Sequence, residues 1–303
     1  MRQITAGPVT TDLVSPDSLL MVARNGHWQG KANVLSERHG HQWPIIDTVA
    51  DACHKPPTAA TAPWLSPELP EPLVSACALT ADTLILQRRS AQAFDGKTSI
   101  SCDSFFRILD MTLPRTNIAP WDVTAWLPSV HLLLFVHRVD GLAPGLYVLL
   151  RNPGSEEKLK VSFGRDFGWQ AVPNAPAYLP LFQLLAADAR ETAKSLSCHQ
   201  DIAADGAFSL GMLAEFTDTL SRAPWRYQRL FWETGMIGQV LYLEAEAAEL
   251  RGTGIGCFFD DGVHDMLAMQ DHAIQSLYHF TVGAPLTDER LQTQPAYAHL
   301  QGR

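Results

Sequence analysis

The sequence lacks the features of a membrane protein, a nucleic-acid-binding protein or a secreted protein. No stretch approaches the ~18–20 apolar residues that a membrane span needs, and the most apolar run, residues 130–136, is interrupted by His131. Lys and Arg number 23 against 32 Asp and Glu, whereas nucleic-acid binding needs clustered positive charge. Residues 1–15 lack the charged-then-apolar pattern of a secretory signal. We therefore expect a cytoplasmic protein with neither membrane nor nucleic acid as a partner.

Cysteine is scarce and its spacing suggests no framework. The five cysteines are widely and unevenly spaced, and the sequence contains no CxxC pair. An odd number in a chain of this length does not indicate a set of disulfides, so a reducing compartment fits best. Ligand pairs with the spacing of a structural zinc site are also missing, and we expect no metal. Cys257 is expected to be a small buried side chain.

The composition is that of an ordinary globular protein. Apolar residues make up 46% and charged residues 18% of the 303 residues, which suffice for one large or two small domains. Six prolines lie within residues 56–72, and proline disfavours helix in its own segment and in the residue before it. We place a domain boundary there, with an N-terminal extension and proline-rich arm over residues 1–72 and one domain over residues 73–303.

Local patterns predict both helices and strands. Helices are expected at residues 44–53, 73–87, 102–111 (with Ser101 or Asp103 as cap) and 233–250. Residues 130–138 and 145–150 are expected to form a β-hairpin, and residues 277–282 a last strand. Residues 207–216 suit either a strand or a helix. The alternation predicts an α+β fold in which helices cover a sheet.

Three segments suggest chemistry. Arg88, Arg89 and Ser90 lie between two predicted helices, and two guanidiniums with a hydroxyl suit an anion such as phosphate. A solvated face or half of a salt bridge is the alternative. Residues 252–256 hold three glycines, which allow close backbone approach to a planar ligand. The alternative for them is a helix C-cap and a tight turn. Arg290 follows a Gly-Ala-Pro sequence at the end of a predicted strand and is a third candidate for binding an anion. The alternative is that it forms a salt bridge on the surface.

Taken together and in order, these segments resemble the nitroreductase family, and most closely its SagB-type branch, which includes azoline dehydrogenases. The matching motifs are RRSAQAF (88–94), VHRVDGLAPGLYVL (136–149), ETGMIGQVLYL (233–243), TGIGCFFDD (253–261) and TVGAPLTDERL (281–291). The match covers residues 73–300. Residues 30–56 also resemble the segment that joins two such halves in longer tandem relatives.

The resemblance implies a nitroreductase-like fold with a mostly antiparallel central sheet, and a homodimer that binds flavin mononucleotide (FMN) at the subunit interface. It implies that Arg88, Arg89 and Ser90 contact the flavin phosphate and ribityl chain and that Arg290 is a second phosphate ligand. Gly254, Ile255 and Gly256 would lie beside the isoalloxazine ring. Gln92 stands where the family commonly has a second basic residue, and it can still donate a hydrogen bond to the cofactor.

The implied activity is hydride transfer between FMN and a small-molecule or peptide substrate. Two reactions remain open, an NAD(P)H-dependent reduction of nitro or quinone acceptors and a SagB-type dehydrogenation. Tyr227 is the candidate general base, although a phenol with a pKa of ~10 must first be made more acidic and a packing role is the alternative. The family's flavin loop is replaced here by residues 121–128. A flavin-free binding or scaffold subunit is therefore a second hypothesis.

Overall fold

The structure, a computed structural model, describes residues 16–27, 30–31, 33–38, 40–58 and 62–300. It divides into two units, residues 1–47 and residues 48–303. In the first unit the chain forms α1 (Pro16–Asn25). The expectation about a secretory signal concerns residues 1–15, which lie outside the described residues. None of the helices in the described part of the chain combines the length and apolarity needed to cross a membrane.

The second unit is built on a seven-stranded sheet in the order β3-β4-β2-β1-β5-β7-β6, in which every neighbouring pair is antiparallel. The strands are β1 (Val130–Val136), β2 (Gly145–Leu149), β3 (Gln170–Ala171), β4 (Leu181–Ala186), β5 (Phe208–Glu215), β6 (Arg251–Ile255) and β7 (Ile274–Gly283). This confirms the predicted hairpin, which is β1 with β2, and the predicted mostly antiparallel sheet. Residues 207–216, which suited either structure, form a strand.

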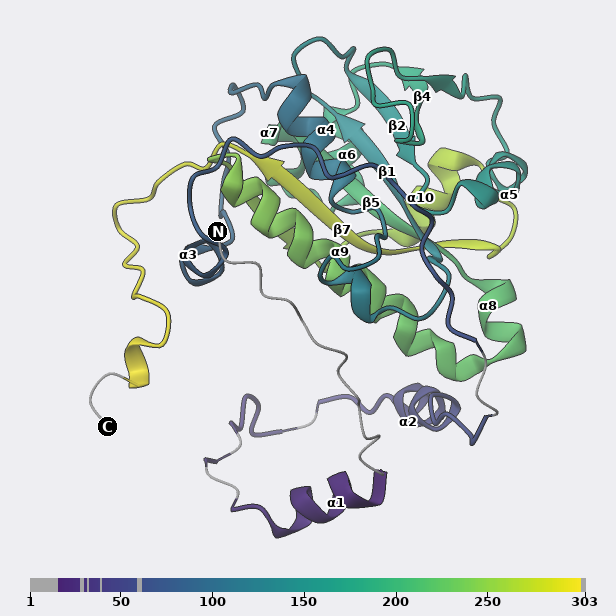
Figure 1. The fold of residues 1–303 in the computed structure, drawn as a ribbon, viewed down its shortest axis with the longest axis vertical. Coiled ribbons are helices and arrows are strands. Elements are labelled where there is room, and N and C mark those ends of the chain that lie inside the picture. The colour runs from purple at the N-terminus through teal and green to yellow at the C-terminus, as the bar shows by residue number, and fades with distance from the viewer. Residues whose placement is uncertain (1–15, 28–29, 32, 39, 59–61, 301–303) are drawn as a thin grey trace. The chain divides into compact units, whose positions relative to one another are not determined.

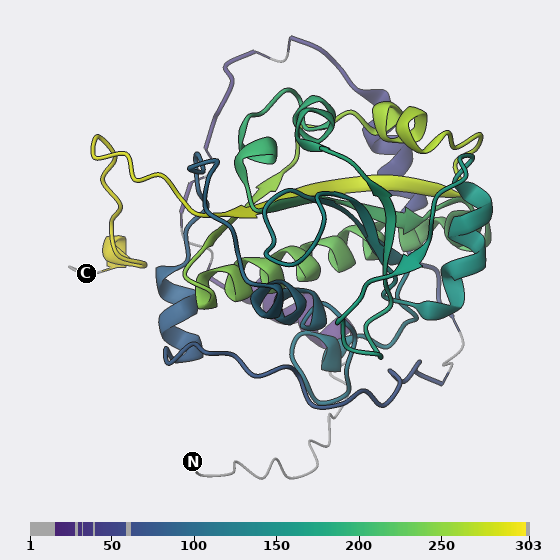
Figure 2. The same cartoon turned by 90° about the horizontal axis from the view of Figure 1, so that it is seen from above.

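Helices cover both faces of the sheet, as Figure 2 shows when the sheet is viewed along its edge. One face carries α4 (Cys102–Asp110) and the long α9 (Tyr227–Ala247), which lies across β7 in Figure 1. The other carries α5 (Glu156–Ser162), α6 (Arg190–Leu196), α7 (Ile202–Asp205) and α10 (Asp260–Leu267). The remaining helices are α2 (Pro44–Ala52), α3 (Ala81–Gln87), α8 (Thr217–Arg222) and four short 3₁₀ turns at Trp121–Val123, Pro153–Ser155, Pro224–Arg226 and Ala298–Leu300.

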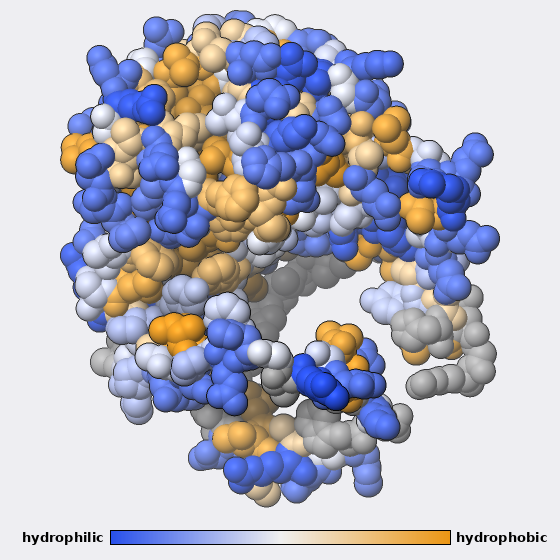
Figure 3. Space-filling view, turned by 180° about the vertical axis from the view of Figure 1, so that it is seen from behind, coloured by the Kyte–Doolittle hydropathy of each residue, from blue (hydrophilic) through white to orange (hydrophobic). Residues whose placement is uncertain are grey.

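The protein has two hydrophobic cores, one on each face of the sheet, because side chains alternate between the two faces along a strand. On β1, Leu132 and Leu134 pack with α4 and α9, whereas Leu133 and Phe135 pack with α5, α6 and α10. Successive side chains point to opposite faces of a sheet, so a strand buried on both sides is apolar throughout. Figure 3 shows the molecule from behind, where hydrophilic residues predominate and hydrophobic residues lie in patches between them.

Several helix boundaries differ from the sequence predictions. The helix expected over residues 73–87 is shorter, because only Ala81–Gln87 is helical. The backbone N–H of Leu73 donates to Asp110 at 2.9 Å, and its carbonyl accepts from Arg107. Side chains of α4 thus hold residue 73 and keep its backbone groups from joining a helix. The helices predicted at 44–53 and 102–111 are confirmed, and Ser101 caps the second by accepting from the Ser104 N–H.

Candidate functional site

The two ends of the 73–303 segment lie side by side. Ala91 donates its N–H to the carbonyl of Gly252 at 3.3 Å, Asp95 donates to Ala284 at 3.0 Å, and the N–H of Leu286 donates to Ala93 at 2.9 Å. Residues 88–94, the start of β6 and the segment after β7 are therefore one structural neighbourhood. They enclose a surface cavity of about 900 Å³ lined by Arg89, Ser90, Ala91, Gln92, Ala93, Arg251, Pro285, Leu286, Thr287, Asp288, Glu289, Leu291 and Thr293.

Tyr242, on α9, organises one wall of this neighbourhood. Its hydroxyl accepts the backbone N–H of Gly254 at 2.9 Å and lies 2.8 Å from the hydroxyl of Ser90. Either hydroxyl can donate in this contact. When Tyr242 donates, Ser90 is the acceptor and its own proton is left to donate elsewhere. Since Ser90 is exposed and lines the cavity, that donor is available to a ligand.

The predicted arginines differ in what they contact. Arg88 stacks on the ring of Tyr242, 4.4 Å from its centroid. Arg89 lines the cavity but donates to the carbonyls of Leu86, Arg88 and Gln294 at 2.8–3.0 Å. The structure thus brings these two arginines to the same region but directs them differently.

Arg290 is held by a neighbour two residues away. It donates to both carboxylate oxygens of Asp288, at 2.9 and 2.7 Å, and these hydrogen bonds lower the pKa of Asp288. The side chain of Arg290 is 88% exposed. Although Asp288, Glu289 and Leu291 line the cavity, Arg290 does not.

Arg251 is the cation that the sequence reasoning missed. It is the first residue of β6 and lines the cavity. Its guanidinium makes no hydrogen bond or ion pair with the described residues, so its donors are available. The only signal in the sequence was a basic residue immediately before the glycine motif, which by itself resembles a basic residue near a helix C-terminus.

The glycine motif, expected to be a loop or a tight turn, is instead the edge strand β6. A Cβ on Gly252 would stand 2.6 Å from the ring of Phe280, and one on Gly254 would stand 2.4 Å from the hydroxyl of Tyr278. The glycines therefore make room for aromatic side chains of β7. Ile255 buries its side chain in the core, at 3% exposed, and its backbone pairs with His279. Gly256 is exposed and follows the strand.

Gln92 and Tyr227 lie in different places. Gln92 is exposed and lines the cavity. Tyr227 begins α9, and its ring packs edge-on against Phe231 at 5.0 Å and Phe216 at 6.3 Å. With a rise of 1.5 Å per helical residue, Tyr227 lies roughly 22 Å from Tyr242 along the helix. Within this chain, Tyr227 does not share the cavity with the other predicted residues.

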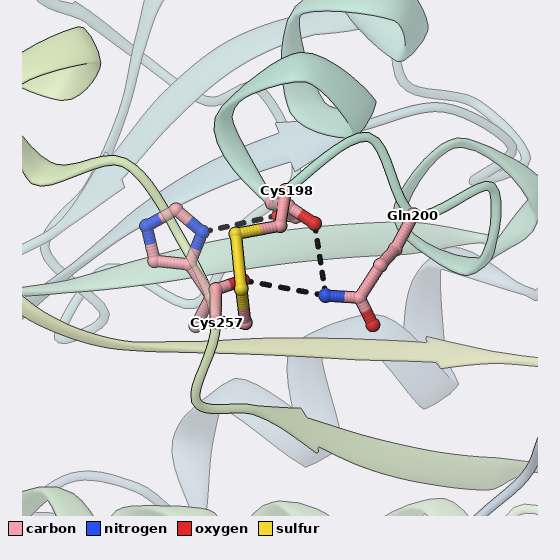
Figure 4. The surroundings of a disulfide bond; sticks show 5 residues. Cys198, Gln200 and Cys257 are labelled. Atoms are coloured by element: carbon pink, nitrogen blue, oxygen red, sulfur yellow. Dashed lines mark hydrogen bonds between the residues drawn. A yellow bond between two sulfur atoms is a disulfide. The ribbon is translucent and has the colours of Figure 1, made fainter. Parts of the chain in front are cut away.

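The expectation that Cys257 is a small buried side chain is wrong. Cys257 is exposed and forms a disulfide with Cys198, with a Cα–Cα distance of 5.8 Å. The amide of Gln200 donates to the carbonyls of Cys257 and Ser197, and so bridges the same two loops (Figure 4). The segment after α6 and the end of β6 meet only in the folded chain, so spacing could not reveal the pair. In the described part of the chain, no group of three or more His, Cys, Asp or Glu side chains could hold a metal ion.

Comparison with known proteins gave structural likeness only. No protein-family model matches the chain, and no curated protein sequence matches it either. A candidate nitroreductase from Anabaena variabilis superposes with a TM-score of 0.52 and 23% identity, over 68% of this chain and 38% of that chain. The fold is nitroreductase-like. This chain thus spans less than two fifths of that relative's length.

Two further structures align over more of their own length but with lower scores. A candidate nitroreductase from Ralstonia eutropha gives a TM-score of 0.49 at 15% identity, over 77% of this chain and 99% of that one. A chain of the Escherichia coli microcin synthetase McbBCD complex, with truncated pro-MccB17 bound, gives 0.46 at 15% identity, over 81% of this chain and 93% of that one. The nitroreductase-like fold and its α+β class accord with the sequence expectation.

Proposed function

We propose that this chain is an FMN-dependent oxidoreductase that moves hydride between the flavin and a small-molecule or peptide substrate. The observation that carries the proposal is the 900 Å³ cavity in which Ser90, Arg89 and Arg251 meet. A volume of this size is at the upper end of the range for cofactor sites. The nitroreductase-like fold, the five ordered sequence motifs and the cavity all support the same cofactor.

The donors in the cavity fit a phosphate. Arg251 has no partner among the described residues, Ser90 can donate its proton when Tyr242 donates to it, and the Gln92 amide is exposed. A guanidinium and a hydroxyl give the short, charge-assisted hydrogen bonds that phosphate oxygens accept. Of the two carboxylates in the wall, Asp288 is neutralised by Arg290, which limits its repulsion of an anion.

In this proposal the protein binds and orients, and the flavin, when bound, supplies a ring that accepts and returns hydride. Arg251 and Ser90 would hold the phosphate, with Arg89 and Gln92 beside them. Arg88 would keep Tyr242 in place by stacking on its ring. Arg290 would act on the phosphate only after leaving Asp288. Gly256, exposed at the end of β6, offers its backbone toward the ring.

We also propose the homodimer that the family resemblance implies. Phe231 and Trp232 on α9 are 38% and 54% exposed, and a Cβ at Gly235, one turn further on, would meet nothing within 4 Å. An exposed aromatic pair beside a glycine suits close helix packing by a second copy. The division of the chain at residue 72, with residues 73–303 as the flavin domain, likewise remains a proposal.

The test is a flavin titration of the purified full chain. We expect a visible flavin absorbance band and saturable FMN binding, which Arg251→Gln weakens by about tenfold to a hundredfold, the loss of one charge-assisted contact. Arg165→Gln is the matched control, because Arg165 is exposed and contacts only a carbonyl at 3.4 Å. Protein that takes up no FMN would overturn the proposal.

Oxidation of NADH or NADPH by the flavin-loaded protein, with a nitro or quinone acceptor, would select the reductase. If the protein binds FMN but oxidises neither NADH nor NADPH, the SagB-type dehydrogenase is favoured. The second hypothesis, a flavin-free binding subunit, rests on the internal hydrogen bonds of Arg89 and Arg290. It predicts no flavin uptake and association with a partner protein.

A further inference from the structure

A second cavity, of about 400 Å³, lies at the start of α9 and is lined in part by an unusual set of side chains. Trp64 of the proline-rich arm lines the cavity, and its backbone N–H donates to the carbonyl of Ala125 at 3.1 Å. Trp126 and three arginines, Arg222, Arg226 and Arg229, also line it. An arm that the sequence presented as a connector is thus part of a cavity.

The carboxylates around this cavity are already paired. Glu233 forms a buried ion pair with Arg151 and accepts from the N–H groups of Ser129 and Val130. Glu215 and Asp218 both bind Lys158 at 2.8 Å.

The three arginines, by contrast, form no salt bridge with any described residue, although the charge of Arg222 contributes to lowering the pKa of Asp218. In a chain with a formal charge of −9, a cluster of unpaired arginines is unexpected unless an anion completes it.

Tryptophan rings lie beside the guanidiniums of two of these arginines. Arg229 lies 4.4 Å from the ring centroid of Trp225 and 5.1 Å from that of Trp126, and Arg226 lies 5.5 Å from Trp225. Stacking uses the flat face of a guanidinium and leaves its N–H groups, at the edge, to bind an anion.

Two features of these arginines favour an added anionic acceptor. The Nε of Arg226 is buried and has no hydrogen-bond partner among the described residues, and a buried donor without an acceptor is costly. Burial, and then the nearby charge of Arg226, lower the pKa of Arg229. A bound phosphate would accept from both arginines and remove their mutual repulsion.

We propose that this cavity binds a nucleoside phosphate, with its phosphate on Arg226 and Arg229 and its base against the indoles of Trp64 and Trp126. The size of the cavity and the pairing of arginine with tryptophan match a ligand that carries both an anion and a flat ring. The site is separate from the proposed flavin cavity, because Arg226 lies roughly 24 Å from Tyr242 along α9. It does not rest on the proposed function.

The experiment is a titration of the flavin-free full chain with ADP, followed by tryptophan fluorescence and calorimetry. We expect saturable binding of one ADP per chain, tighter at low salt, and binding of adenosine at least about tenfold weaker. Arg229→Gln and Arg226→Gln should each weaken ADP binding by about tenfold or more, as expected for loss of a charge-assisted contact. Arg165→Gln should leave it unchanged.

Arg222→Gln separates a loss of binding from misfolding. Arg222 is exposed, so its replacement should weaken ADP binding without altering the circular dichroism spectrum. The proposal is overturned if ADP binding does not saturate or if adenosine binds as tightly as ADP. It is also overturned if the Arg229→Gln and Arg222→Gln variants both bind ADP as tightly as the wild type. It is also overturned if FMN displaces ADP in a one-to-one competition, since the cavity would then be a flavin site. Failure of FMN binding to the chain leaves this measurement unaffected.

Discussion

The hydroxyl of Ser90 lies 2.8 Å from the hydroxyl of Tyr242, although 152 residues separate them in the sequence. Tyr242 also accepts the N–H of Gly254. One side chain of α9 therefore links the arginine-serine segment to the glycine strand. This link, more than any single arginine, defines the candidate site.

Replacing Tyr242 with Phe should disturb both partners of its hydroxyl. The N–H of Gly254 would lose its acceptor, and Ser90 would lose its hydrogen-bond partner. We expect a loss of about 1 kcal/mol in the free energy of unfolding, measured by urea denaturation, and weaker FMN binding. Tyr227→Phe is the control, because the ring of Tyr227 keeps its contacts with Phe216 and Phe231. Equal effects of the two substitutions would contradict the role given to Tyr242.

Replacing Gly252 with Ala should destabilise the fold through crowding. The new Cβ would lie 2.6 Å from the ring of Phe280, which is fully buried and has no space to move. We expect a loss of about 1–3 kcal/mol in unfolding free energy. Gly256→Ala is the matched control, since its nearest neighbouring atom would be 3.9 Å away. If both variants unfold at the same urea concentration, the glycines are not required by packing.

Reducing the Cys198–Cys257 bond should lower stability through the unfolded chain. The disulfide closes a loop over a sequence separation of 59 residues, and the chain-entropy model gives about 4 kcal/mol for a loop of this length. The melting temperature should therefore fall with reductant in the wild type but not in Cys257→Ser. Thiol titration of the unfolded, unreduced protein should find the three free cysteines Cys53, Cys77 and Cys102. Five reactive thiols before reduction would show that the bond does not form.

Stability should fall on mild acidification because of His279. The ring is 2% exposed, and burial lowers its pKa to about 4 from the ordinary 6.5. The unfolded chain therefore takes up the proton first as the pH drops. The stabilising contribution is complete above pH 6.5 and is lost as the pH falls toward 4, by up to about 3 kcal/mol.

Urea denaturation at several pH values between 7.5 and 4.5 measures this loss. His279→Gln should reduce the pH dependence without abolishing it, since the amide does not titrate but burial also lowers the pKa of His137 to about 4. His54→Gln should leave the profile as it is, because His54 is 83% exposed. A wild-type profile that does not change between pH 7 and pH 5 would refute the assignment to His279.

The sequence predicted those parts of the fold whose signals are local. The hairpin of β1 and β2 follows from two apolar runs separated by a Gly-Pro-rich turn. The cap of α4 follows from a serine before an apolar period. The helix predicted over residues 73–87 begins only at Ala81. The backbone groups of Leu73 bond instead to Asp110 and Arg107, and no local pattern encodes such partners.

For the candidate site, the sequence determined which residues could serve: two arginines and a serine at one end, glycines and Arg290 at the other. Tertiary structure alone decided their roles. It turned the glycines into a strand, paired Arg290 with Asp288, joined Cys198 to Cys257 and left Arg251 in the cavity without a partner among the described residues. The reason is that a side chain's donors go to whichever acceptors the folded chain brings within hydrogen-bond distance, and here many of those partners are far away in sequence.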